Sequence, residues 1–177
     1  MTSPRDATHE AFDRQSTDPQ AYLELARTLT IAAAPEVARF REVLHGPRSD
    51  TRLEMLAYVN AYMLLTGLAF ENLLKAIALS RGWTIEQLTK LRGGHGLVAI
   101  ADALTLELAP VERDYLRRLE EFVVWAGRYP VPRRSDTYAT SERDGLLTFM
   151  SDDPTRGEHL FDRLAEHVGP SPRPTDD

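Results

Sequence analysis

The feature that most constrains the fold is a long apolar run, residues 55–70, which Glu71 and Asn72 follow directly. Apolar residues recur at helical spacing from position 53 to position 77, and three further leucines widen this stripe in the middle of the run. The middle of such a helix has no polar face and must be buried on nearly all sides. The run is shorter than the ~20 residues that a membrane span needs. We therefore expect a core helix over residues 51–81.

Start and stop signals place other helices around this one. Asp50 is the expected N-cap of the core helix, and Gly82 should end it. A second long helix should begin at Asp18-Pro19, and Pro35 should break or kink it. Residues 84–87 have the pattern of a capping box. The expected helices besides the core helix are 19–45, 85–91, 97–104, 110–126, a short segment capped by Ser141 up to Met150, and 154–168.

No stretch of the sequence alternates strictly between apolar and polar residues, so no strand is predicted. The fold class is therefore an all-α, up-and-down antiparallel helical bundle, with extra helices at its N- and C-terminal ends. Its 177 residues suit one domain. We expect that domain over residues 18–168, a flexible N-terminal tail over 1–17 and a disordered C-terminal tail over 169–177.

Composition excludes several classes of protein. There are 21 basic residues, of which only Lys75 and Lys90 are lysines, against 27 acidic residues, so the net charge of −6 excludes a polycation. Cysteine is absent, which excludes disulfides, thiolate zinc sites and cysteine nucleophiles. The N-terminus has no apolar segment of a secretory signal, so we expect a cytoplasmic protein that does not enter a membrane.

Glu71 is the first candidate site residue, because it lies at the end of the apolar run. A buried carboxylate is costly without a partner. Lys75 stands at the favourable i+4 position, and His95 and Arg128 are the other candidate partners. Either the carboxylate belongs to a partly buried ion pair near a helix end, or it marks a polar notch in the bundle where a ligand binds.

A second candidate group lies in the segment RYPVP, residues 128–132, which the prolines prevent from being helical. Arg128 and Tyr129 are thus held on a rigid loop. Guanidinium groups suit phosphates, and aromatic rings suit unpaired bases. Six arginines occur between positions 111 and 134, but acidic residues alternate with them on the helix. A solvated, salt-bridged helix face explains that helical cluster equally well.

Known catalytic and metal motifs are missing. The sequence has no HExxH, no GxSxG and no Ser-Lys or Cys-His arrangement. The glycines around His95 join two predicted helices and lack the strand and the Gly-Lys-Ser/Thr ending of a phosphate-binding loop. His159 and His167 could share a face of the last helix, but two such histidines are usually solvated. We expect no metal and no cofactor.

Three segments in order resemble the HEPN superfamily (higher eukaryotes and prokaryotes nucleotide-binding domain). They are AFENLLKAI (69–77), GHGLVAI (94–100) and WAGRYPVP (125–132). The family has an E-K/N-x-L-K-A stretch on a helix, a G/T-H-D/N-L segment and, in many members, an R-Y-P turn. The resemblance covers roughly residues 50–135, about half of the chain. It implies a helical bundle that usually forms a dimer.

Many HEPN members are metal-independent ribonucleases, in which an R-x(4–6)-H motif acts on RNA. Here only Arg39 and His45 have that spacing, and they lie upstream of Glu71 instead of downstream. No histidine follows Arg128 at positions 133–135, and Gly96 replaces the usual Asp or Asn after His95. The chain therefore lacks the standard nuclease motif in its expected place.

The resemblance implies a protein that binds a nucleotide, RNA or a partner, in a bacterial defence or toxin–antitoxin setting. Its ligand-binding residues would be Glu71, Lys75, His95, Arg128 and Tyr129. A homodimer is expected, with a cognate antitoxin or a nucleotidyltransferase as further partners. One alternative is an active metal-independent endoribonuclease that uses Arg128 with His95 or Tyr129. Another is a non-catalytic structural dimer.

Overall fold

The computed structural model describes residues 16–46 and 51–169, and every regular element in these ranges is helical. The helices are α2 (Pro19–His45), α3 (Arg52–Ser80), α4 (Ile85–Thr89), α5 (Leu97–Ala103), α6 (Pro110–Glu121), α7 (Ser135–Arg143) and α8 (Asp153–Ala165), with short turns η1 (Arg92–Gly94) and η2 (Phe122–Ala126). The predicted all-α class is confirmed. The predicted tails lie almost entirely outside the described residues.

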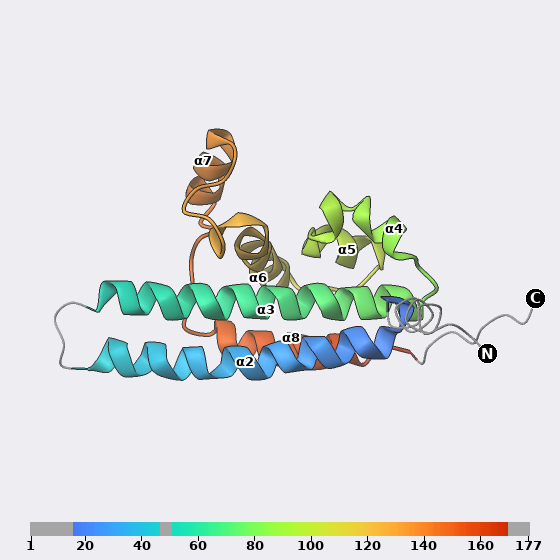
Figure 1. Ribbon diagram of the computed structural model, residues 1–177, viewed down its shortest axis with the longest axis horizontal. Coiled ribbons are helices and arrows are strands. Elements are labelled where there is room, and N and C mark those ends of the chain that lie inside the picture. The colour runs from blue at the N-terminus through green and yellow to red at the C-terminus, as the bar shows by residue number, and fades with distance from the viewer. Residues whose placement is uncertain (1–15, 47–50, 170–177) are drawn as a thin grey trace, which may run out of the picture.

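The helices form layers on the two sides of α3 (Figure 1). The antiparallel pair of α2 and α3 runs the length of the molecule, and α8 lies on the same side of α3 as α2. The other four helices lie on the opposite side. Helix α6 is viewed nearly end-on beside α3, so it crosses α3 and does not run antiparallel to it. The up-and-down arrangement therefore describes α2, α3 and α8, but not the whole chain.

Helix α3 is the core helix that its apolar run predicts. Its buried residues extend from Tyr62 to Leu79, so the predicted burial of its middle part is confirmed on most sides of the helix. No residue of its first ten, 52–61, is buried. Among the described helices, α3 alone is long and apolar enough to cross a membrane, and 67% of its most apolar window is buried in the fold. That burial is typical of a core helix.

Most predicted helix boundaries are confirmed. Asp18 caps α2, accepting a hydrogen bond from the backbone N–H of Gln20 at 3.0 Å. Thr84 and Gln87 form both bonds of the predicted capping box. Gly82 follows α3 with a φ of +81°, a left-handed conformation that glycine adopts without strain. Asp50, the predicted cap of α3, lies outside the described residues.

The prediction that Ser141 caps a later segment is wrong, and no break occurs at Pro35. Helix α2 continues through Pro35, because the residue is exposed and the carbonyl that it leaves unpaired belongs to the exposed Ile31 and can bind water. Helix α7 occupies residues for which no helix is predicted, and Ser141 lies inside this helix. Its hydroxyl does not cap a later segment: it lies 2.7 Å from a carboxylate oxygen of Glu121 and 3.0 Å from the carbonyl of Thr137, either of which can accept its proton.

Glycine allows α6 and the turn after it to approach α3 closely. A Cβ on Gly67 would lie 2.5 Å from Cγ2 of Val123 and 3.0 Å from the backbone oxygen of Leu119. A Cβ on Gly127 would lie 2.9 Å from Cβ of Leu64. No other side chain fits at these crossings without moving a helix. They hold the end of η2, and the turn that follows it, against α3.

Candidate functional site

The site is built around Glu71, a carboxylate that α3 holds in the core with 5% of its surface exposed. Nζ of Lys75, one helical turn later, lies 2.5 Å from Oε1. Nδ1 of His95 lies 2.8 Å from Oε2. Each carboxylate oxygen therefore has its own partner. Of the three partners expected from the sequence, two are confirmed, and the third, Arg128, does not contact this carboxylate.

The turn between η1 and α5 brings His95 to α3. Gly93 and Gly94 have φ values of +71° and +83°, which side-chain-bearing residues rarely adopt. This pair of left-handed residues reverses the chain just before His95. The ring has one edge on the buried carboxylate and the other at the surface, since 43% of its side chain is exposed. These glycines join two helices, as predicted, and their turn places His95 against Glu71.

Arg128 and Tyr129 follow the π-helical turn η2. Their backbone N–H groups both donate to the carbonyl of Trp125, at 2.9 and 2.8 Å. The Arg128 guanidinium donates to the carbonyl of Val124 at 2.8 Å and lies 5.7 Å from the centre of the Tyr129 ring. Both side chains are exposed. Among the described residues, no carboxylate pairs with Arg128.

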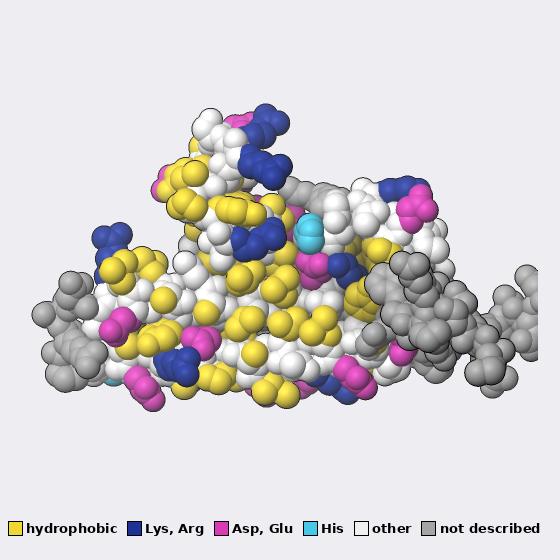
Figure 2. Space-filling view, viewed as in Figure 1, with side chains coloured by type: hydrophobic (Ala, Val, Ile, Leu, Met, Phe, Trp, Pro, Cys, Tyr) yellow, Lys and Arg dark blue, Asp and Glu magenta, His cyan; other side chains and the backbone are white. Residues whose placement is uncertain are grey.

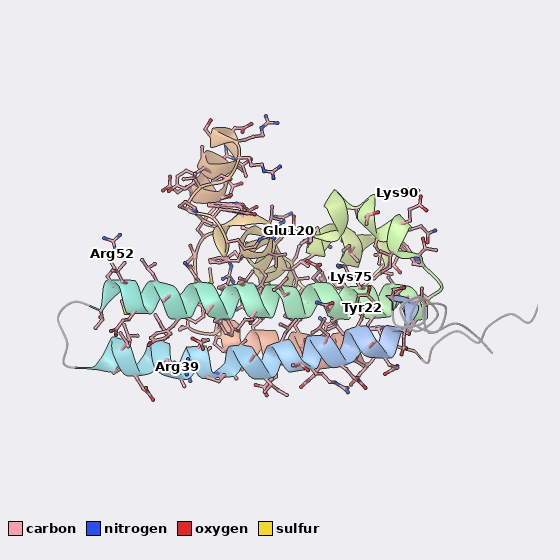
Figure 3. All side chains as sticks on the ribbon, in the orientation of Figure 1. Tyr22, Arg39, Arg52, Lys75, Lys90 and Glu120 are labelled. Atoms are coloured by element: carbon pink, nitrogen blue, oxygen red, sulfur yellow. The ribbon has the colours of Figure 1, made fainter. Side chains whose placement is uncertain are left out.

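These two groups lie on the same face of α3. Gly127, next to Arg128, packs against Leu64, which is seven residues before Glu71. Seven residues are almost two full turns, so both positions share a face about 10 Å apart along the axis. Figure 3 shows Lys75 on the stretch of α3 beside α5. Figure 2 shows a histidine flanked by acidic and basic side chains, between the part of the surface that α7 forms and the part that α4 and α5 form.

Most of the other arginines in the cluster are paired. Arg113 forms two hydrogen bonds with Asp102, at 2.9 and 2.7 Å, and this contact holds the pKa of Asp102 below its usual range. Arg134 pairs with Asp136 at 2.8 Å. The charges of Arg113 and Arg134 are therefore already paired with carboxylates of their own. Arg128 differs from these arginines because its charge has no such partner.

The sequence did not reveal a buried polar network between α6 and α8. The guanidinium of Arg118 contacts both oxygens of Asp153, at 2.6 and 2.7 Å, with both side chains at most 1% exposed. It also lies 5.5 Å from the ring of Tyr115, whose hydroxyl is 3.1 Å from that of Tyr62. Burial raises the pKa of both phenols. These groups are enclosed in the core, so we assign them a structural role.

The remaining candidates stay apart from the site. Arg39 pairs with Glu36 at 2.8 Å, and His45 ends α2 next to the start of α3, far from Glu71 (Figure 1). His159 and His167 are exposed. In the part of the chain that the structure describes, no three His, Cys, Asp or Glu side chains are grouped to hold a metal ion.

Comparisons with known proteins found no counterpart. No protein-family model matches the sequence, and neither a curated protein nor a solved structure matches it.

Proposed function

We propose that the protein is a HEPN-like module that binds a nucleotide or RNA at a site formed by Glu71 and Lys75 of α3, by His95 before α5, and by Arg128 and Tyr129 after η2. The observation that carries the proposal is the contact of one buried carboxylate with both Lys75 and His95, at 2.5 and 2.8 Å. The three residues belong to two of the three HEPN-like segments. The third segment supplies the turn that packs on the same helix face.

The side chains suit the parts of a nucleotide. The exposed Arg128 offers positive charge to phosphate oxygens, and Lys75 keeps 19% of its side chain exposed beside its pair with Glu71. Tyr129 is 56% exposed and offers a ring on which a base can stack. His95 offers a ring nitrogen at the surface. Tyr129 and Arg128 already contact one another, so the base and the phosphate would be recognised side by side.

Binding measurements on Arg128→Ala test the site. A hydrogen bond to a charged group contributes about 1.5–3 kcal/mol, so we expect the variant to bind a mononucleotide or a single-stranded RNA roughly tenfold more weakly or worse. Arg134→Ala is the matched control, because Arg134 already pairs with Asp136. If Arg128→Ala binds as tightly as the wild type, the assignment of the site is wrong.

A second candidate function is a metal-independent endoribonuclease. The observation that favours it is the carboxylate–histidine pair, because an acidic side chain that orients an imidazole ring is a common arrangement in acid–base catalysis. His95 would move the proton, with Tyr129 as the other candidate, and Arg128 would stabilise charge on the phosphate. Incubation of the purified protein with RNA in EDTA decides it. Absence of cleavage, together with absence of toxicity on expression, would exclude this function.

The proposed setting is a bacterial defence or toxin–antitoxin system in the cytoplasm, with the protein acting as a homodimer. A cognate antitoxin or a nucleotidyltransferase would be the further partner. Light scattering of the purified chain measures its mass. A dimer that binds neither nucleotide nor RNA would favour the alternative of a purely structural dimer.

A further inference from the structure

The protonation pattern of the Glu71 cluster follows from its contacts. The Lys75 ammonium can only donate hydrogen bonds, and it contacts Oε1 of Glu71. The carboxylate that faces it is therefore an ionised acceptor. Because Oε2 of the same group lies 2.8 Å from Nδ1 of His95, Nδ1 must carry the proton. In the neutral ring, Nε2 then has a free lone pair.

The surroundings of the ring leave Nε2 open to a ligand. In the described part of the chain, Nε2 has no hydrogen-bond partner, and 43% of the His95 side chain is exposed. The ring carbon bonded to Nε2 is Cδ2, and a Cβ placed on Gly93 would lie 3.9 Å from it. Residue 93 is glycine, so no side chain from this position covers that edge of the ring.

We propose that Glu71 is a positioning residue that fixes the tautomer of His95, so that Nε2 accepts a hydrogen bond from a hydroxyl group of the ligand. This inference rests on the proposed function and deepens it. In a nucleotide, the sugar supplies such a hydroxyl, and the 2′-hydroxyl distinguishes ribose from deoxyribose. Lys75 contacts the other oxygen of the same carboxylate. Its positive charge would therefore lie near the sugar to which the phosphate of the nucleotide is attached. The site therefore selects a ribonucleotide.

Long-range ¹H–¹⁵N NMR spectra of the full chain test the tautomer without any ligand. At about pH 8, where imidazole rings are largely neutral, we expect the His95 signals of a ring protonated at Nδ1. In Glu71→Gln, the amide can donate as well as accept, so we expect a mixture of both tautomers. The exposed His159 and His167 serve as internal controls and should keep the same signals. A wild-type ring protonated at Nε2, or an unchanged ring in Glu71→Gln, would overturn the positioning role.

Paired oligonucleotides test the recognition of the hydroxyl. We expect the wild type to bind a single-stranded RNA at least tenfold more tightly than the DNA of the same sequence. His95→Ala should lose most of this preference, whereas His159→Ala should keep it. Equal binding of RNA and DNA by the wild type would overturn the inference but leave the proposed function standing. If neither oligonucleotide nor a mononucleotide binds, the proposed function fails, and the NMR result still decides the role of Glu71.

Discussion

Nδ1 of His95 lies 2.8 Å from Oε2 of Glu71, although the residues are 24 positions apart in the chain. The other oxygen of that carboxylate contacts Lys75, one helical turn away. One buried side chain thereby links the core helix to the glycine-rich turn before α5. It also fixes the orientation of two polar groups that reach the surface. This carboxylate is the centre of the candidate site, and its loss should affect both stability and binding.

Removal of the Glu71 carboxylate should destabilise the fold. Glu71→Ala leaves Lys75 and His95 without their acceptor at a partly buried position, and such a loss costs about 1–3 kcal/mol. Urea denaturation measures the change. The control is Glu86→Ala, because Glu86 and Lys90 form an i,i+4 pair of the same kind, 3.6 Å apart, at the surface. Exposed pairs contribute little, so equal losses in the two variants would contradict the structural role of Glu71.

The buried pair of Arg118 and Asp153 should be far more sensitive. Asp153→Ala leaves a guanidinium that is 1% exposed without its carboxylate, which typically costs about 3–5 kcal/mol. Replacing both residues by apolar ones, as in Arg118→Met with Asp153→Leu, should restore part of the loss. Urea midpoints of the single and double variants test this. A double variant less stable than Asp153→Ala would show that the charge pair is not what holds α8 to α6.

The two buried phenols predict a dependence of stability on alkaline pH. Burial raises the pKa of Tyr62, and it raises that of Tyr115 well above its usual value. In the unfolded chain both ionise at about pH 10. Their contribution to the free energy of unfolding is therefore complete below that pH and is lost as the pH rises towards the folded pKa values.

The control for this dependence is the double variant Tyr62→Phe with Tyr115→Phe, which keeps the rings and removes both ionisable hydroxyls. Urea midpoints measured between neutral pH and about pH 11 should fall less steeply for the variant than for the wild type. If the two proteins show the same fall above about pH 10, the buried phenols do not contribute to it.

Close packing at Gly67 predicts a steric effect. In Gly67→Ala the new Cβ would meet Cγ2 of Val123 at 2.5 Å, so α6 must move away from α3 at a cost of about 1–3 kcal/mol. Gly82→Ala is the control, because nothing lies within 4 Å of its Cβ position and only the positive φ is unfavourable. Denaturation compares their stability. Because α6 continues through η2 to Arg128, Gly67→Ala should also weaken ligand binding. If binding is unchanged, the loop that holds Arg128 is not part of the binding site.

Local spacing was enough to predict much of this protein. The apolar run predicts α3, and the i+4 spacing predicts the contact of Glu71 with Lys75, which the structure confirms. The capping boxes and glycines mark most helix ends. His95 could be named as a partner of Glu71 only as one of three candidates, because its position depends on how the glycine turn folds back onto α3.

Features that depend on tertiary contacts were missed. Arg118 looks like one more residue of a basic helix face, and nothing near it in the sequence indicates that Asp153 will bury it. Helix α7 was missed because distant residues hold it: Ser141 lies 2.7 Å from Glu121, and the ring of Tyr138 lies 6.0 Å from that of Trp125. Pro35 was expected to break or kink α2, and it does not break the helix, because the local rule takes no account of a solvent-exposed carbonyl.

The most direct test of the proposed site is the affinity of a single-stranded RNA for the wild type, His95→Ala and Arg128→Ala, measured by fluorescence anisotropy at one fixed salt concentration. Both residues lie on the same face of α3, but they do not share a hydrogen bond. The account predicts that the wild type binds and that each variant binds at least tenfold more weakly, with an unchanged thermal midpoint for Arg128→Ala. Equal affinities for the three proteins would contradict it.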